Sequence, residues 1–287
     1  CMKQLDVLSQ EKLQQEIDHN VRLALLEDVG SGDLTAQLLK DNENVSADVI
    51  VREQAVLCGV PWFEAVMKHV DDRITVNWAY EEGDIMVANS LVCHLKGPVR
   101  SVLTGERTAL NFLQLLSGVA SKTKTYVDLV QGTQAGIYDT RKTIPGLRLA
   151  QKYAVRIGGG NNQRFALYDG ILIKENHIAA AGGVSQALSQ ALKAHNVPVQ
   201  IEVETLSQLK EAIAAGASLI LLDNFSLEKM REAVRMAKTY SANIVLEASG
   251  GINQQTVRAI AETGVDRISI GELTKHIKAT DYSLRII

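Results

Sequence analysis

Short apolar stretches such as 171–173 and 219–222 recur six times between Ile137 and Glu272, and each runs into a polar cluster followed by a helical pattern. Apolar runs of this length between amphipathic helices are typical of parallel strands that are buried on both faces. In a β/α barrel the C-terminal ends of all strands meet at one mouth, where the active sites of this fold lie. The clusters occupy 139–142, 174–177, 202–204, 223–224, 247–251 and 271–272. The sequence therefore predicts a mouth that gathers Arg, Lys, Asp, Glu and His side chains with a Gly-Gly turn.

The first part of the chain lacks this alternation. Residues 45–51 and 74–80 alternate as strands do, and a long helix is expected from Pro98 to Ser117, with Gly118 just past its end. Beyond Gly136, helices are expected at 147–157, 185–195, 207–215, 226–240 and 254–263. We therefore expect an α+β domain over residues 1–116 and a β/α barrel over 117–273. Six strands are fewer than the usual eight, which predicts an open or incomplete barrel.

Composition and charge argue against several classes of function. The 287 residues, 46% of them hydrophobic, are enough for one or two domains with a full core. A net charge of −3 does not favour a nucleic-acid or acidic-membrane partner. We expect neither a transmembrane helix nor a signal peptide. Cys58 and Cys93 lack metal or redox spacing and are expected to be buried, reduced thiols in a cytoplasmic protein.

A set of cations falls where the strands are predicted to end. Arg141, Lys142 and Lys174 follow predicted strands, Arg164 lies in the loop before the strand of Lys174, and Arg107 interrupts an otherwise apolar helix. Cations that share one mouth repel each other unless an anion neutralises them. Arginine suits carboxylate or phosphate, and lysine acts as a point charge. Surface ion pairs are the alternative for any one of them, but for the set we favour an anionic ligand.

Two carboxylates interrupt apolar strand sequence. Glu202 lies in Ile-Glu-Val-Glu and Asp223 in Leu-Leu-Asp-Asn, and such residues are rarely buried unless they are paired or bind a metal. They could hold Mg²⁺ or ribose hydroxyls, or stabilise a developing positive charge. The alternative is a structural ion pair with Lys174.

Small residues follow the last two predicted strands, namely Ser249, Gly250 and Gly251, and then Gly271. In barrels these two loops often bind phosphate through backbone N–H groups. Residues 158–160 are three glycines but not a dinucleotide-binding fingerprint, and we expect a flexible loop there. His177 remains open between a catalytic and a structural role. The residues alone thus indicate a phosphorylated ligand with further anionic groups and Mg²⁺, as in phosphosugar or phosphoribosyl chemistry.

Longer motifs carry a resemblance to a known family. The segments 139–148 (DTRKTIPGLR), 152–160 (KYAVRIGGG) and 172–177 (LIKENH) closely resemble those of the quinolinate phosphoribosyltransferases. Further matches are 27–35, 106–111, 221–224 and 247–252, so the resemblance covers nearly the whole chain.

The resemblance implies a reaction of quinolinate with phosphoribosyl pyrophosphate and Mg²⁺ that yields nicotinate mononucleotide, pyrophosphate and CO₂, a step of NAD biosynthesis. It implies that quinolinate carboxylates are bound by Arg107, Arg141, Arg164 and Lys174. It implies that Lys142, Glu202 and Asp223 serve the phosphoribosyl pyrophosphate, its Mg²⁺ and the cationic ribosyl centre, with Glu202 and Asp223 as direct or indirect metal ligands. Phosphate would be cradled by Ser249, Gly250, Gly251 and Gly271, and Thr140 and Gln163 complete the expected substrate site.

The family resemblance also implies an N-terminal α/β sandwich, an open barrel of about seven strands and a tail, 274–287, that returns to the first domain. It implies a homodimer with shared active sites and leaves any higher assembly open. Many relatives have histidine where this chain has Gln163. An amide donates a hydrogen bond but carries no charge, so we expect Gln163 only to orient its surroundings.

Three other functions compete with this one. A related phosphoribosyltransferase could act on nicotinate or another pyridine acid without decarboxylation, although several ligand-facing cations favour a dicarboxylate. An aldolase could form a Schiff base on Lys174. A sensor or transport-accessory protein derived from a barrel would not need Glu202 or Asp223.

Overall fold

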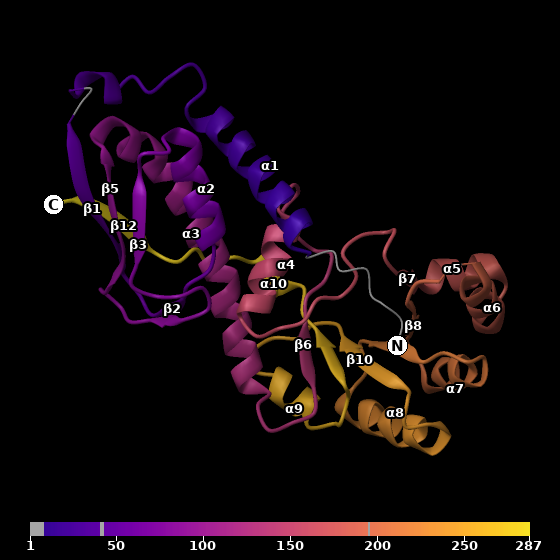
Figure 1. The fold of residues 1–287 in the computed structure, drawn as a ribbon. Helices are drawn as coiled ribbons and strands as arrows, with labels where there is room; N and C mark the ends of the chain where they lie inside the picture. The colour runs from indigo at the N-terminus through magenta and orange to yellow at the C-terminus, as the bar shows by residue number, and fades with distance from the viewer. Residues whose placement is uncertain (1–8, 41–42, 195) are drawn as a thin grey trace. The chain divides into compact units, whose positions relative to one another are not determined.

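The computed structural model describes residues 9–40, 43–194 and 196–287, and the chain divides into two compact units. The first, here the sheet unit, comprises the described residues up to Lys124 together with Thr143–Gly159 and Leu273–Ile287. The second, here the barrel unit, comprises Thr125–Lys142 and Gly160–Glu272. Each unit is built on its own sheet (Figure 1).

The sheet unit holds a four-stranded antiparallel sheet in the order β12-β1-β5-β3 and a small pair, β2 and β4. Its strands are β1 (Asn44–Val51), β2 (Ala55–Val56), β3 (Thr75–Trp78), β4 (Ile85–Met86), β5 (Leu91–Pro98) and β12 (Tyr282–Ile286). Its helices are α1 (Gln10–Asp28), η1 (Ala36–Leu38), α2 (Val60–Val70), the first part of α3 (Val99–Leu129) and α4 (Arg148–Ile157). The last strand, β12, pairs with β1, so the end of the chain is part of this sheet.

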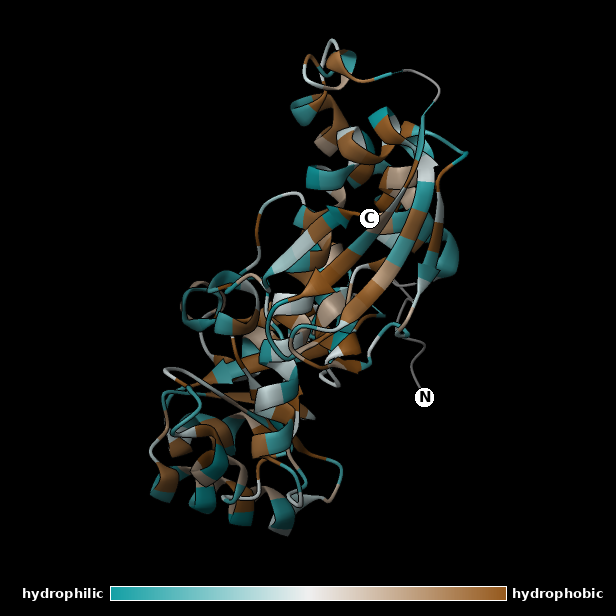
Figure 2. Cartoon of the chain, turned by 90° about the vertical axis from the view of Figure 1, so that its left-hand side faces the viewer, coloured by the Kyte–Doolittle hydropathy of each residue, from teal (hydrophilic) through white to brown (hydrophobic). Residues whose placement is uncertain are grey.

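One face of this sheet is apolar because β1 alternates between buried and partly exposed residues. Ala47, Val49 and Val51 are fully buried, and α2 contributes Trp62 and Phe63 to the same core. Burying large side chains such as these is the main stabilising contribution to a core of this kind. Figure 2 shows the alternation of hydrophobic and hydrophilic residues along the strands.

The long helix α3 does not end where we expected. It continues through Gly118 to Leu129, for 31 residues in all. A Cβ at Gly118 would lie 2.3 Å from the backbone oxygen of Lys278. Glycine is therefore required here by a close approach of the chain, not by a helix end, and the expected end at Ser117 is wrong.

The division into units also differs from the boundary expected near residue 116. The units separate within α3, between Lys124 and Thr125, and α4 belongs to the sheet unit. Gly158, at the end of α4, packs closely on α3, since a Cβ there would lie 2.4 Å from the backbone oxygen of Ala120. The first of the three glycines at 158–160 is thus held by packing, where we had expected a flexible loop.

The barrel unit confirms the expected α/β class with an incomplete barrel. Its strands are β6 (Gly136–Tyr138), β7 (Ile171–Ile173), β8 (Val199–Val203), β9 (Leu219–Asp223), β10 (Val245–Ser249) and β11 (Arg267–Ser269). They form one parallel sheet in the order β6-β11-β10-β9-β8-β7. Among the described residues, β6 and β7 are consecutive strands of this unit yet lie at opposite edges of the sheet, which leaves the barrel open between them.

The helices between these strands begin and end largely as capping residues predict. They are α5 (Glu175–Ala181), α6 (Val184–Ala194), α7 (Leu206–Ala214), α8 (Leu227–Tyr240) and α9 (Val257–Ala261), and α10 (Glu272–Lys275) follows β11 where the chain passes into the sheet unit. Thr205 and Ser226 cap α7 and α8 with their side-chain oxygens, and Gly216 and Gly264 have the positive φ expected after a helix. The expected end of one helix at His195 lies outside the described residues.

The helix expected over 254–263 is shorter than predicted. The Oδ1 of Asn253 accepts hydrogen bonds from the backbone N–H groups of Gln255 and Thr256, at 3.0 and 3.1 Å. This asparagine turn competes with the first helical turn, so α9 begins only at Val257. Within the described ranges, no helix combines the length and the apolar character needed to cross a membrane.

Candidate active site

The carboxyl ends of the parallel strands bring two carboxylates and a lysine together. Glu202 lies on β8 and Asp223 ends the neighbouring strand β9, while Lys174 follows β7. The Nζ atom of Lys174 lies 3.7 Å from Oε2 of Glu202. Burial raises the pKa of Glu202, Lys174 lowers it, and the nearby charge of Asp223 raises it again. The two carboxylates therefore repel each other, and Lys174 offsets part of that repulsion.

His177 has a structural role next to this cluster. Its Nδ1 accepts a hydrogen bond of 3.0 Å from the backbone N–H of Lys174, at the start of α5. The ring therefore caps the helix and fixes the backbone that carries the lysine. This contact accounts for His177, for which the sequence left a catalytic role equally open.

Asp223 is in turn held by the residue that follows it. The Nδ2 of Asn224 donates to Oδ2 of Asp223 at 2.9 Å, and its backbone N–H donates to the oxygen of Ser249 at 3.0 Å. Asn224 has a left-handed backbone with φ of 54°, and a Cβ at Gly250 would lie 2.1 Å from its Oδ1. Gly250 is thus required by the close approach of Asn224. Asn224 was given no role from the sequence.

The loops after β6 and β11 also meet. The backbone N–H of Lys142 donates to Oγ1 of Thr140 at 3.1 Å. A Cβ at Gly271 would lie 2.8 Å from Cδ of Lys142 and 3.5 Å from Oγ1 of Thr140. The absence of a side chain at Gly271 is therefore what allows the Lys142 stem to cross this loop.

Two arginines influence each other in the same unit. Burial lowers the pKa of Arg164, and the positive charge of Arg141 lowers it further. Nη1 of Arg164 donates to the oxygen of Gly170 at 3.0 Å. The Nε of Arg141 is buried and has no hydrogen-bond partner among the described residues. A buried, unpartnered guanidinium N–H beside a second guanidinium is the arrangement that an anionic ligand completes.

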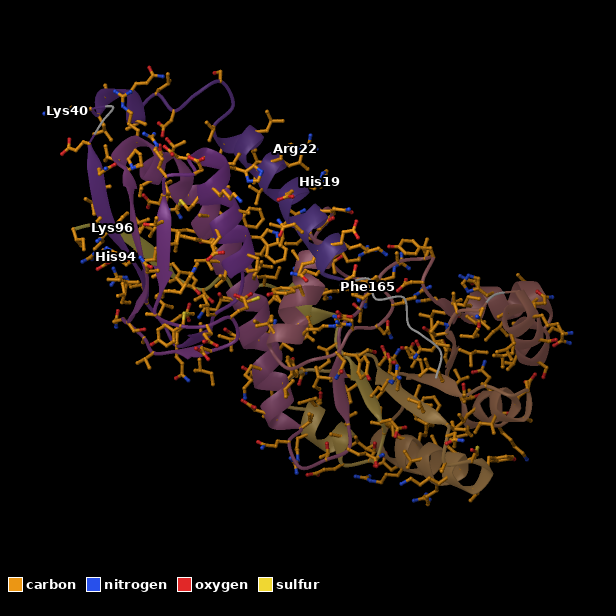
Figure 3. The ribbon with its side chains drawn as sticks, in the orientation of Figure 1. His19, Arg22, Lys40, His94, Lys96 and Phe165 are labelled. Atoms are coloured by element: carbon orange, nitrogen blue, oxygen red, sulfur yellow. The ribbon has the colours of Figure 1, made fainter. Side chains whose placement is uncertain are left out.

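The loop that carries Arg164 is well ordered by local hydrogen bonds. Asp169 accepts from the backbone N–H groups of Phe165 and Ala166, both at 2.7 Å. Phe165, labelled in Figure 3, lies on the segment between α4 and β7 and is buried. The arginine is thus presented by a fixed turn.

Two buried carboxylates support the site and were given no role from sequence. Asp139 accepts from Nδ2 of Asn162 at 2.6 Å and from the backbone N–H of Gln163 at 2.9 Å. Glu247 accepts from the side-chain amide of Gln163 and is fully buried. The signal that identified Glu202, a carboxylate inside an apolar strand, applies equally to Glu247.

Arg107 is the one predicted site residue that belongs to the sheet unit. It lies on α3 with an exposed side chain. Burial raises the pKa of its neighbour Glu106, and Arg107 lowers it. The other predicted residues, Thr140, Arg141, Lys142, Gln163, Arg164, Lys174, Glu202, Asp223, Ser249, Gly250, Gly251 and Gly271, all belong to the barrel unit.

The carboxylates of this site can be compared with the ligands that the expected Mg²⁺ would need. In the part of the chain that the structure describes, no group of three or more His, Cys, Asp or Glu side chains could hold a metal. Mg²⁺ is commonly bound by one or two carboxylates together with substrate phosphates. The adjacent pair Glu202 and Asp223 fits such a shared site and does not fit a metal cage made by protein alone.

Comparisons with known proteins assign nearly the full length of the chain to one family. Residues 33–117 and 119–285 match the families described as quinolinate phosphoribosyl transferase, N-terminal domain and C-terminal domain. A Bacillus subtilis protein named "Probable nicotinate-nucleotide pyrophosphorylase [carboxylating]" is 41% identical, with 91% of this chain and 90% of that protein covered. The nicotinate-nucleotide pyrophosphorylase [carboxylating] of Mycobacterium leprae is 39% identical, with coverage of 92% and 95%. A solved nicotinate-nucleotide pyrophosphorylase from Francisella tularensis has a TM-score of 0.91 and 46% identity, with 96% and 97% covered.

Proposed function

We propose roles for the residues of this site from the premise that the chain belongs to the quinolinate phosphoribosyltransferase family and catalyses its decarboxylating reaction in NAD biosynthesis. The substrates are quinolinate and phosphoribosyl pyrophosphate. Membership of this family sets aside the nicotinate-specific enzyme, the Schiff-base aldolase and the sensor that the sequence alone left open.

The observation that carries the proposed binding mode is the pair Arg141 and Arg164. The Nε of Arg141 is buried without a protein partner, and its charge acts on Arg164. We assign the carboxylates of quinolinate to these two guanidinium groups and to Lys174. A dicarboxylate neutralises clustered cations better than a monocarboxylate does, and paired N–H donors fit its geometry.

Other loops of the same unit bind phosphoribosyl pyrophosphate. Lys142 binds its pyrophosphate group as a point charge, and the backbone at Thr140 and Gly271, which lie beside this lysine, surrounds the same group. The turn of Ser249, Gly250 and Gly251, which follows β10, takes the ribose phosphate through backbone N–H groups.

Glu202 and Asp223 face the ribose in this arrangement. When Mg²⁺ is bound, it neutralises phosphate charge, and these two carboxylates hold it directly or through water. The carboxylates also stabilise positive charge that develops at ribose C1. The ring nitrogen forms its bond to C1 while the C1–O bond breaks and pyrophosphate takes the electron pair. The pyridinium then accepts the electrons of the bond to the adjacent carboxylate, CO₂ leaves, and the ring carbon takes a proton.

We further propose a homodimer in which Arg107 of one copy completes the quinolinate site of the other. Arg107 is exposed on α3, in the sheet unit, whereas its expected co-ligands belong to the barrel unit. We place the enzyme in the cytoplasm, in keeping with the free, buried thiols of Cys58 and Cys93, and we propose neither a nucleic-acid nor a membrane partner.

An end-point assay tests the proposed roles. The protein, quinolinate, phosphoribosyl pyrophosphate and Mg²⁺ should give nicotinate mononucleotide and one CO₂ per turnover, and chelation of Mg²⁺ should abolish both. Replacing quinolinate with nicotinate should give little product. Equal efficiency with nicotinate, or full activity without a divalent cation, would contradict the assigned carboxylate or metal roles respectively.

A further inference from the structure

Glu247 is a buried carboxylate for which the proposed reaction has no use. It lies in the middle of β10 and is fully buried. Burial raises its pKa, although hydrogen bonds from Gln200, Ser269 and Gln163 and the charge of Arg267 lower it. An amide at this position would fill the same space without the desolvation penalty of a charge, so a carboxylate here calls for an explanation.

The contacts of Glu247 connect two parts of the site. Oε1 accepts from Nε2 of Gln163, and Oε2 accepts from Nε2 of Gln200 at 2.9 Å. Gln163 precedes Arg164, and Gln200 lies on β8 two residues before Glu202. In the sheet, β8, β9 and β10 are successive neighbours. One carboxylate therefore holds both the segment of a proposed quinolinate ligand and the strand of a proposed ribose ligand.

The orientation of Gln163 follows from this contact. With the amide reversed, its Oε1 would face a carboxylate oxygen, and the two acceptors would repel each other. The backbone N–H of Gln163 is fixed as well, because it donates to Oδ1 of Asp139 at 2.9 Å. Residue 163 is thus held at its backbone by the loop after β6 and at its side chain by β10.

We infer that Glu247 is a positioning residue for quinolinate: through the amide of Gln163 it fixes the segment that presents Arg164 to the substrate carboxylates. The inference rests on the proposed binding of quinolinate at Arg141 and Arg164. Glu247 itself touches no substrate, and Gln163 acts as a neutral donor whose partner is the protein. Exchange of either residue should therefore weaken quinolinate binding and leave the binding of phosphoribosyl pyrophosphate intact.

Three variants test the inference by steady-state kinetics and quinolinate calorimetry. Glu247→Gln removes the charge and one of the two acceptor oxygens that hold Gln163 and Gln200, and Gln163→Leu removes the donor while keeping a side chain of similar volume. Each should raise the KM for quinolinate roughly tenfold, the scale of one lost hydrogen bond to a charged group. The double variant should be no worse than the poorer single variant, because both changes act on the same contact. Gln163→His keeps an N–H donor and should restore most of the quinolinate binding that Gln163→Leu loses.

Matched controls separate this role from general loosening of the fold. Glu82→Gln alters a partly buried carboxylate of the sheet unit and should leave the ratio of the two KM values unchanged. Independent, additive effects of the two barrel variants, an equal rise in both KM values, or an unchanged KM for quinolinate would overturn the inference. If Glu247→Gln fails to fold, the inference is tested by the quinolinate KM of Gln163→Leu compared with that of Gln163→His. Failure of the unchanged protein to bind quinolinate would instead overturn the proposed site.

Discussion

The Nζ atom of Lys174 lies 3.7 Å from Oε2 of Glu202, a separation that leaves a half-exposed ammonium only loosely paired. Exposed pairs of this kind contribute little to folding, commonly about 0–1 kcal/mol. The lysine is nevertheless held at a defined place, because its backbone N–H is bound by His177. The pair is therefore better suited to receive an anion than to stabilise the barrel.

Lys174→Met should abolish turnover while the protein stays folded. Loss of a charged ligand to a substrate carboxylate should lower kcat/KM by at least about 100-fold, whereas the free energy of unfolding should change by no more than about 0.5 kcal/mol. Kinetics and denaturant unfolding measure the two effects. The control is Lys193→Met, an exposed lysine on α6, which should alter neither. A Lys174→Met variant that does not fold would make this lysine a structural ion-pair partner.

Gly271→Ala should damage the site through Lys142. The new Cβ would lie 2.8 Å from Cδ of Lys142, so the lysine stem must move away from its place beside Thr140. We expect the KM for phosphoribosyl pyrophosphate to rise roughly tenfold, a change of about 1.4 kcal/mol. In a Lys142→Ala background the same exchange should have little further effect, because the clash is gone. Full additivity of the two exchanges would show that Gly271 acts on something other than Lys142.

The two strand-end carboxylates illustrate how much of the site could be predicted from sequence. Parallel strands buried on both faces expose polar residues mainly at their ends, so Glu202 and Asp223 could be assigned to one mouth without coordinates. Glu247 lies in the middle of β10 and shows a different signal, a carboxylate inside apolar strand sequence, but its partners Gln163 and Gln200 are ordinary amides at distant positions. Nothing local in the sequence shows that three such residues meet.

The fold shows the same limit at Gly118. Local rules assign a glycine after a helical pattern to a helix end, which is correct for Gly158, Gly216 and Gly264. Gly118 instead lies inside α3 and is contacted by the backbone at Lys278, and Gly158 is contacted by the backbone at Ala120 in addition to ending α4. Such contacts come from tertiary packing, so helix length and unit boundaries could not be read from capping residues alone.

Glu82 gives the sheet unit a predictable pH dependence. Its carboxylate accepts from the backbone N–H groups of Gly59 and Val60 at 2.8 and 3.0 Å, at the start of α2. Burial raises its pKa above the ordinary 4.5 despite these bonds. The folded state therefore favours the protonated form, and this contribution to stability is complete below pH 4.5 and is lost as the pH rises through the folded-state pKa.

The measurement is the free energy of unfolding of the unchanged protein and of Glu82→Gln across pH 4 to 8. The unchanged protein should lose stability relative to the variant as the pH rises, because only its side chain must ionise in a partly buried place. Arg73→Gln, at an exposed position after α2, serves as a control that leaves Glu82 in place. A difference between the unchanged protein and Glu82→Gln that stays constant over this range would contradict the raised pKa.

Arg107→Ala and Asp223→Ala should each be nearly inactive alone and should complement each other when mixed. In the proposed dimer one site needs Arg107 from one copy and Asp223 from the other, so a mixed dimer has one intact site of two. Random pairing makes half of the dimers mixed, and activity should recover to roughly a quarter of the unchanged protein. Co-expression with two affinity tags, with mass measurement of the heterodimer, checks this.

Two variants of the same unit, Glu202→Ala and Asp223→Ala, should not complement, since every site in their mixed dimer lacks one carboxylate. Heterodimers of Arg107→Ala with Asp223→Ala that stay inactive would mean that each site lies within a single chain.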